Sequence, residues 1–278
     1  MRRAPYVRRR RHLGWAYRLA VVVLYPIMRF CFRWDIRDSA RLTDAEGGII
    51  VGANHISYID PMVLSFMLWE ADRPPRFLAK ESIMRVPVIG AIVRNAGQIP
   101  VYRESKDAVL AIRDALTALE KDECVVIYPE GTVTRDPHLW PMAGKTGAVR
   151  LALASGRPLY PVAQWGPQEV MRPYVKEFRL FPRKTMKLAV GTPVDLADLV
   201  GRPLTTETLT IGTDRLMDAI TALEASLRGE PAPAERLVFR GGRAVPRSSP
   251  DSAQQPEGDN PQVDNPTADS PEADGPVA

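Results

Sequence analysis

The stretch Ile49–Asp60, with the sequence IIVGANHISYID, joins a short apolar run to a cluster of polar side chains. Ile49–Ala53 is rich in β-branched residues, which predicts a buried strand. His55 and Asp60 follow just beyond its end, where open α/β sheets place their ligands. A carboxylate at this spacing can fold back onto one imidazole nitrogen and leave the other to take a proton from a hydroxyl group. The stretch therefore predicts a sheet, and beside it either a general base or a histidine whose ring is satisfied by hydrogen bonds within the loop.

Further short apolar runs, rich in Val, Ile and Tyr, alternate with helical patterns between residues 47 and 195. Strands are expected at Arg76–Ala79, Gln98–Tyr102, Cys124–Tyr128, Leu159–Gln164 and Lys187–Val190. Helices are expected after Ser105, from about Thr146 to Ser155 and from about Thr206 to Leu227. Alternation of this kind is typical of an α/β sheet covered by helices.

The N-terminal segment, residues 1–37, is basic and aromatic. Six arginines precede His12, and an apolar stretch runs from Trp15 to Phe32. Only ten residues between Arg18 and Arg29 are free of charge, whereas a transmembrane helix needs about 20 apolar residues. We expect a helix that lies in the lipid headgroup region with its arginines on anionic lipid. The alternatives are a core-packed helix with a solvated basic arm, and an export signal.

The C-terminal segment, residues 231–278, changes in character. From Pro256 a proline recurs every five residues, and residues 248–278 hold seven acidic residues and no lysine or arginine. Almost no large apolar side chains are present, so ordering this segment would cost more entropy than burial could offset. We expect a disordered tail, either a solvated spacer or a polyanion that competes for the basic face. The chain is thus divided into residues 1–37, a catalytic domain over 38–230, and the tail.

Composition limits the classes of function. The chain has 278 residues, 45% of them apolar, which suits a globular protein. Two cysteines without a C-x-x-C pair exclude a disulfide framework and the common zinc motifs. The formal charge of +4 becomes about +11 when the acidic tail is set aside, which suits nucleic acid, an anionic membrane or phosphorylated substrates. No G-x-S-x-G elbow is present, and Gly144-Lys145-Thr146 lacks the earlier glycine of a phosphate-binding loop.

Other polar groups also follow predicted strands. Lys80 follows one strand, Gly97 and Arg103 flank the next, and Tyr128-Pro129-Glu130-Gly131-Thr132 ends a third. We expect these clusters to meet His55 at one edge of the sheet.

These clusters resemble the four sequence blocks of the glycerolipid acyltransferase family, especially its 1-acylglycerol-3-phosphate acyltransferases. The block N-H-x-S-x-x-D matches Asn54, His55, Ser57 and Asp60, and G-x-I-x-x-x-R matches Gly97, Ile99 and Arg103. The block F-P-E-G-T matches Pro129, Glu130, Gly131 and Thr132, with Tyr128 in place of Phe. A fourth, strand-like block resembles Tyr160-Pro161-Val162. The resemblance covers roughly residues 30–215, and it departs from many relatives where Val133 and Thr134 precede Arg135.

The resemblance implies a glycerol-3-phosphate acyltransferase-like fold, with a mixed β-sheet flanked by helices. It also implies transfer of an acyl group from acyl-CoA or acyl-carrier protein to the hydroxyl of a lysophospholipid, with no metal or other cofactor. His55 would deprotonate the hydroxyl and Asp60 would orient it. Arg103, Lys80 and either Arg135 or Lys145 would hold the phosphate. We expect Glu130 to bridge to Arg103 or to the glycerol hydroxyl, and Gly131 to let backbone approach the ligand. We place Asn54, Ser57, Gly97 and Thr132 with the substrate-binding residues.

The expected product is phosphatidate, made on the cytoplasmic face of the cell membrane by a peripheral enzyme. Glycerol 3-phosphate or another lysophospholipid is the alternative acceptor. An inactive, basic membrane-binding protein is the alternative of another class. No nucleic-acid partner is expected.

Overall fold

The fold is built on one mixed sheet. The computed structural model describes residues 14–86, 90, 94–101, 105–175, 177–240 and 243–247. Within them a seven-stranded sheet has the order β1-β7-β6-β2-β5-β3-β4. Its strands are β1 (Arg33–Arg37), β2 (Ile49–Ala53), β3 (Pro75–Lys80), β4 (Ile99–Val101), β5 (Cys124–Ile127), β6 (Leu159–Trp165) and β7 (Thr185–Val190).

The five strands from β6 to β4 run in the same direction. β2 pairs in parallel with β5 and β6, and β3 pairs in parallel with β5 and β4. β7 is antiparallel to β6, and β1 is parallel to β7. The carboxyl ends of β2, β5, β3 and β4 therefore lie along one edge, as the polar clusters after the predicted strands require.

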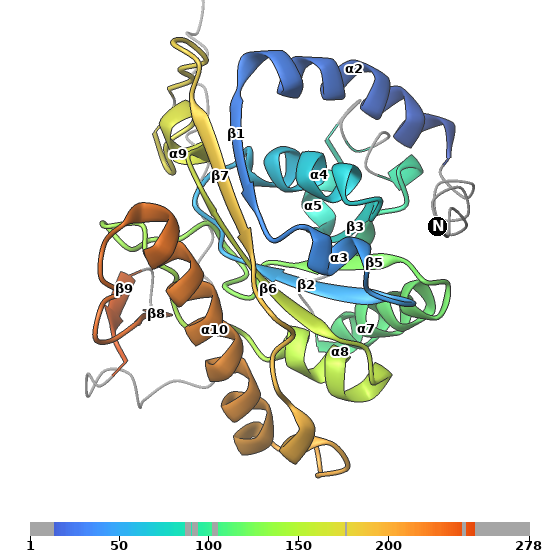
Figure 1. The fold of residues 1–278 in the computed structure, drawn as a ribbon. Coiled ribbons are helices and arrows are strands. Elements are labelled where there is room, and N and C mark those ends of the chain that lie inside the picture. Colours follow the sequence, from blue (N-terminus) through green and yellow to red (C-terminus); the bar gives the residue numbers. More distant parts are fainter. Residues whose placement is uncertain are drawn as a thin grey trace, which may run out of the picture.

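Helices cover both faces of this sheet (Figure 1). The longer ones are α2 (Trp15–Cys31), α4 (Asp60–Glu70), α7 (Ser105–Glu120), α8 (Gly147–Ser155) and α10 (Thr206–Arg228). The short ones are α3 (Ala40–Thr43), α5 (Glu81–Met84), α9 (Pro167–Val170) and the 3₁₀ turn η1 (Ala197–Leu199). The expected α/β class with a mixed sheet flanked by helices is confirmed, and each predicted strand and helix lies within a few residues of its expected place.

Alternation along β2 explains the two layers of the core. Ile49, Val51 and Ala53 pack into a cluster with α4, whereas Ile50 packs with residues of α7, α8 and α10. Both faces of β2 are fully buried, because helices cover a largely parallel sheet on both sides. His55 is thereby placed at the end of one of the most buried strands of the molecule.

The N-terminal segment differs from the expected boundary at residue 37. β1 is an edge strand of the main sheet, and Trp34 on it stacks on Phe66 of α4 at 3.9 Å between ring centroids. The domain built on the sheet therefore includes Arg33–Arg37, and in the described part of the chain α2 lies before it. Within the described residues, no helix is long and apolar enough to cross a membrane.

The C-terminal boundary is also corrected. Residues expected to be disordered form a two-stranded hairpin, β8 (Leu237–Arg240) and β9 (Arg243–Pro246). Ion pairs hold it to α10, from Arg236 to Asp218 and from Arg247 to Asp214. The sequence does not reveal this hairpin, because each of its strands has only four residues. The proline-rich repeat lies outside the described residues.

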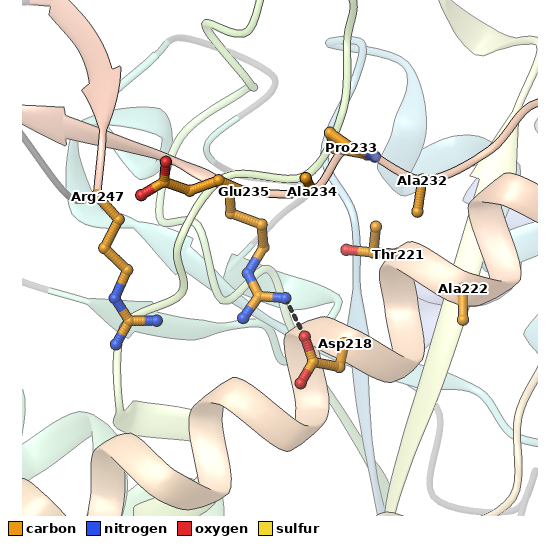
Figure 2. A pocket seen from close by; sticks show the side chains of 9 residues that line it. Asp218, Thr221, Ala222, Ala232, Pro233, Ala234, Glu235 and Arg247 are labelled. Carbon is orange, nitrogen blue, oxygen red and sulfur yellow. Dashed lines mark hydrogen bonds and ion pairs between the residues drawn. The ribbon is translucent and has the colours of Figure 1, made fainter.

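A cavity of about 310 Å³ lies where this segment meets α10 (Figure 2). Asp218, Thr221 and Ala222 of α10 line one side of it, and the segment from Ala232 to Arg236 lines the other. None of the candidate site residues lines this cavity.

Candidate active site

His55 and Asp60 form the contact that their spacing predicts. Asp60 is the first residue of α4, and the turn between β2 and α4 brings its Oδ2 to 2.7 Å from His55 Nδ1. Within the described residues, the ring has no other hydrogen-bond partner. The ring is 17% exposed and the carboxylate is fully buried. Nδ1 is thus held by an acceptor, and Nε2 remains to serve as the base.

The Asp60 carboxylate is fixed by the same turn. Its Oδ2 also accepts hydrogen bonds from the backbone N–H groups of Ile56, at 2.6 Å, and Ser57, at 2.8 Å. Burial raises the pKa of Asp60 above its ordinary value, and the hydrogen bonds from His55 and the two amides oppose this rise. These donors, together with the N-terminus of α4, favour the ionised form that supports an imidazolium.

Tyr128 covers one face of the His55 ring. The two rings stack with centroids 4.2 Å apart and an interplanar angle of 19°. Tyr128 directly follows β5, the strand that neighbours β2, so the sheet itself sets this contact. The stack restricts rotation of the imidazole about its side-chain bonds.

Glu130 ties the loop after β5 to the loop after β2. One carboxylate oxygen accepts from the backbone N–H of His55 and the other from that of Met142, each at 3.0 Å. Burial raises the pKa of Glu130 to about 8. In the described structure both oxygens are occupied by backbone groups, and the predicted bridge from Glu130 to Arg103 concerns a residue outside the described range.

Asn54 points into the protein, although it neighbours the base. Its side-chain NH₂ donates to the backbone oxygen of Gln164 at 3.0 Å and to the Glu224 carboxylate at 2.7 Å. Its side-chain oxygen accepts from the backbone N–H of Gln164 at 2.8 Å. Asn54, Gln164 and Glu224 are all fully buried. In this structure the polar atoms of Asn54 are occupied by the protein, so Asn54 locks the end of β2 to β6 and α10.

Glu224 connects this network to two tryptophans. It pairs with Arg228 at 3.2 Å, and the Arg228 guanidinium lies 3.8 Å from the ring centroid of Trp140 and 4.3 Å from that of Trp165. Burial raises the pKa of Glu224 to about 8, and Arg228 opposes the rise. The loop that carries Trp140 is thus held against α10.

Ser57 is also buried in the turn. Its hydroxyl donates to the backbone oxygen of Met171 at 2.7 Å and accepts from the Ile59 N–H at 3.3 Å. The side chain therefore joins the β2–α4 turn to the segment after α9.

Gly131, Thr132 and Lys145 lie together after β5. Gly131 has a φ of +71°, and a Cβ there would stand 3.1 Å from Lys145 Cε and 3.3 Å from its Nζ. The backbone N–H of Lys145 donates to the Pro129 oxygen at 2.7 Å, and its side chain is exposed. Thr132 is half-buried. An exposed ammonium group therefore stands beside a loop that only glycine fits well.

Arg135 lies between two aromatic rings. Its guanidinium carbon is 4.7 Å from the ring centroid of Tyr174 and 4.5 Å from that of Phe239, which belongs to β8. Its Nε is buried without a hydrogen-bond partner in the described structure. The hairpin thus contributes Phe239 as one of the two rings beside Arg135, a predicted phosphate-binding residue.

The second motif block is described only in part. Lys80 ends β3, and its side chain lies outside the described part of the structure, as does Arg103 entirely. Gly97 has a φ of +71°, and a Cβ there would stand 1.6 Å from Arg76 Nη1. Arg76 itself pairs with Glu123 at 2.8 Å. Gly97 therefore makes room for a packed arginine.

The sequence reading missed Gln164 and Glu224, which hold the loop that carries the base. Glu224 lies among the buried residues of α10, between Ile220 and Leu227. A charged residue on an apolar stripe is the signal that points to such a network. In the described part of the chain, no group of His, Cys, Asp and Glu is arranged to hold a metal ion.

Comparisons with known proteins agree with the motifs. A family model described as "Acyltransferase" matches residues 34–165. The 1-acyl-sn-glycerol-3-phosphate acyltransferase of Bacillus subtilis (strain 168) is 29% identical over 183 residues, which cover 66% of this chain and 84% of that protein. The chloroplastic 1-acyl-sn-glycerol-3-phosphate acyltransferase BAT2 of Brassica napus is 27% identical over 165 residues, or 59% of this chain. The match spans only 45% of that protein's length.

A solved structure has a similar fold. It is the 1-acyl-sn-glycerophosphate (LPA) acyltransferase PlsC from Thermotoga maritima, with a TM-score of 0.55 and 22% sequence identity. The likeness covers 76% of this chain and 82% of that one. The resemblance seen in the sequence blocks is thereby confirmed over residues 34–165, the part of the chain that the acyltransferase family model matches.

Proposed function

We propose that this protein transfers a fatty acyl group from a thioester to the free hydroxyl of 1-acylglycerol 3-phosphate, giving phosphatidate. The observation that carries the proposal is the His55–Asp60 pair, joined at 2.7 Å beyond the end of β2. The relatives that carry this activity in their names support the choice of acceptor.

His55 acts as the general base. Its Nε2 takes the hydroxyl proton while the oxygen attacks the thioester carbonyl. The new C–O bond forms, the C–S bond breaks, and the proton passes to the leaving thiolate. Asp60 Oδ2 fixes the tautomer and stabilises the imidazolium that forms in between.

Basic side chains hold the acceptor phosphate. Arg135 and Lys145 are the described cations near the loop after β5, and Arg103 and Lys80 join them by the motif assignment. An arginine between two rings keeps its guanidinium plane oriented, which suits bidentate binding of an oxyanion.

A substrate panel tests the proposal. Purified full-length protein is incubated with labelled acyl-CoA or acyl-carrier protein and with lysophosphatidate, glycerol 3-phosphate or other lysophospholipids. Labelled phosphatidate is the expected product. Preference for another acceptor would move the assignment to glycerol 3-phosphate or another lysolipid, and no transfer to any acceptor would favour the inactive membrane-binding protein.

We also propose a peripheral location on the cytoplasmic face of the membrane, and the exposed face of α2 supports the contact with the membrane. Its inner face packs on α4, where Tyr17 lies against Trp69 and Tyr25 against Phe66. Its outer face carries an exposed apolar stripe at helical spacing: Trp15, Leu19, Val22, Val23, Ile27 and Phe30. Such a stripe beside arginines is typical of a helix in the lipid interface.

Removal of residues 1–31, which leaves β1 in place, tests this location. We expect the truncated protein to lose binding to vesicles, and anionic vesicles to be affected more than neutral ones. High salt should weaken binding of the intact chain only in part, because apolar burial is not screened. Release by salt alone would exclude apolar insertion.

A further inference from the structure

A second exposed apolar surface lies beside the candidate site, on the connection between α9 and β7. We name residues 171–184 the aromatic loop; residue 176 in it lies outside the described part. Tyr174 is 49% exposed, Phe178 60% and Phe181 71%. Single exposed apolar residues are ordinary, whereas a group of exposed aromatic side chains on one segment can mark a membrane or protein contact.

The charges of the aromatic loop have mainly one sign. Arg172, Arg179 and Arg183 are exposed, and the one acidic residue of the loop, Glu177, pairs with Arg179. Exposed aromatic rings among arginines fit the headgroup region of an anionic bilayer, where rings enter the interface and guanidinium groups meet phosphates.

The aromatic loop contacts the turn that carries the base. Its first residue, Met171, accepts the hydrogen bond of the Ser57 hydroxyl at 2.7 Å. Tyr174 meets Tyr58 edge to face at 6.3 Å between centroids and lies against Arg135. One end of the loop therefore lies beside the candidate site.

The other end adjoins the exit of α2. Arg183 donates to the backbone oxygen of Phe32 at 2.7 Å, and the Arg33 N–H donates to the Lys184 oxygen at 2.9 Å. Phe30, at the end of α2, is 74% exposed. Figure 1 places the turn before β7 beside this end of α2. The exposed face of α2 and the aromatic loop thus form neighbouring surfaces.

We propose that the aromatic loop inserts into the surface of an anionic bilayer and brings the membrane next to the candidate site, so that a lipid acceptor reaches His55 from the bilayer. This inference rests on the proposed acyl transfer to a lipid. The aromatic loop would connect the membrane directly to the candidate site, because it contacts both Ser57 and Arg135.

The test is the double variant Phe178→Ser/Phe181→Ser in the full chain. Its matched control is Val200→Ser/Leu204→Ser, since these residues are 67% and 40% exposed in the connection after the other end of β7. We expect the loop variant to bind phosphatidylglycerol-containing vesicles at least tenfold more weakly and to lose most turnover of a long-chain acceptor in those vesicles.

A short-chain, water-soluble lysophosphatidate separates the two proposals. The loop variant should acylate it as fast as the wild type and keep its melting temperature. If the wild type fails on this acceptor, the proposed function fails. If the wild type succeeds and the loop variant equals the control on vesicles, the loop proposal is overturned.

A second inference concerns the hydroxyl of Tyr128, where the family block has phenylalanine. Three polar atoms near the catalytic pair are buried without a hydrogen bond of good geometry in the described structure: Asp60 Oδ1, Tyr128 Oη and Gln164 Oε1. Their residues share one side of the sheet, because Tyr128 and Gln164 stand two positions after Val126 and Val162, which pack with α4. Burial and the charge of Asp60 raise the pKa of Tyr128, and the Gln164 amide opposes the rise.

The chemistry of these atoms fits one small ligand. The carboxylate and amide oxygens only accept hydrogen bonds, whereas the phenol can donate one. A water molecule can accept from the phenol and donate to both oxygens, which satisfies all three. We propose that Tyr128, Asp60 and Gln164 enclose one water molecule, and that this water makes Tyr128 a positioning residue for the Asp60–His55 pair.

Tyr128→Phe, the change to the family residue, tests the water site; Tyr160→Phe, in the same core cluster, is its control. A high-resolution crystal structure of the wild type should contain a water within hydrogen-bond distance of the three atoms, and the variant should lack it. We expect kcat to fall about tenfold, the size of one hydrogen bond to a charged group, with both KM values unchanged.

The pH profile separates positioning from packing. Without a hydrogen-bond donor at Asp60 Oδ1, the carboxylate binds a proton more tightly, and so does the Asp60–His55 pair as a whole. The acidic limb of the plot of kcat against pH should therefore move to higher pH. The other carboxyl groups around the pair, Glu130 and Glu224, are unchanged in the variant. A wild-type crystal without this water, or a variant with unchanged kcat and pH profile, would overturn the water site.

Discussion

Glu130 accepts a hydrogen bond from the backbone N–H of His55 at 3.0 Å, although 75 positions separate the two residues. Its second oxygen accepts from Met142. The carboxylate of the third sequence block therefore fixes the backbone of the residue that carries the base, and β2 and β5 bring the two together.

The raised pKa of Glu130 predicts how stability depends on pH. An ordinary Glu titrates near 4.5, whereas burial raises the pKa of Glu130 to about 8. Between these values the folded state binds more protons than the unfolded state, so this contribution is complete below about pH 4.5 and is lost as the pH rises through about 8. Glu224, with the same raised value, acts in the same direction.

Thermal unfolding at several pH values between 5 and 8.5, as a rough working range, measures this effect. We expect the melting temperature to fall toward the alkaline end, and the fall to be shallower in Glu130→Gln, which does not titrate. A melting temperature that rises across this range would contradict the assignment.

Gly131 gives a second prediction, with Gly156 as its control. Both have left-handed φ angles, +71° and +64°, so alanine at either costs about 1–2 kcal/mol of stability. Only at Gly131 would the new Cβ meet the Lys145 side chain; at Gly156 it meets nothing within 4 Å. We expect similar losses of melting temperature, and a loss of acyltransfer only in Gly131→Ala. Equal activity in both variants would remove Gly131 from the site.

The sequence predicts those parts of the fold and of the candidate site whose contacts join residues close together in the chain. The His55–Asp60 contact spans five positions, and the β2 strand is marked by its own apolar residues, so both follow from local spacing. The predicted strand ends also meet at one edge, because parallel strands have their carboxyl ends on one side.

Contacts between segments far apart in the chain could not be predicted, because local spacing carries no information about them. The sequence predicts that Glu130 bridges to Arg103 or to the glycerol hydroxyl, because nothing in its neighbourhood reveals that the backbone N–H groups of His55 and Met142 face it. Gln164 and Glu224 reach Asn54 across 110 and 170 positions. β1 looked like part of the membrane segment because its pairing partner, β7, lies far along the chain.

Arg135 provides a test of phosphate binding. Its guanidinium carbon lies within 4.7 Å of the ring centroids of Tyr174 and Phe239, and lysine cannot reproduce either these contacts or the bidentate fork. We expect Arg135→Lys to raise the KM for lysophosphatidate about tenfold, roughly one charge-assisted hydrogen bond, with little change in kcat.

Arg215→Lys is the matched control, because Arg215 pairs with Asp198 on the exposed side of α10. An increase in the KM for the acyl donor alone would assign Arg135 to the donor site. Identical kinetics in both variants would leave Arg103, Lys80 and Lys145 as the phosphate-binding groups.

The most direct test of the central claim is kcat for acyl transfer to lysophosphatidate in His55→Ala and Asp60→Asn, measured beside their melting curves. The 2.7 Å contact makes His55 the base and Asp60 its orienting group. We predict that His55→Ala loses about 10²–10⁴-fold in kcat, that Asp60→Asn is also severely impaired, and that His55→Ala keeps a native melting profile. A natively folded His55→Ala protein with near-normal kcat would contradict the mechanism.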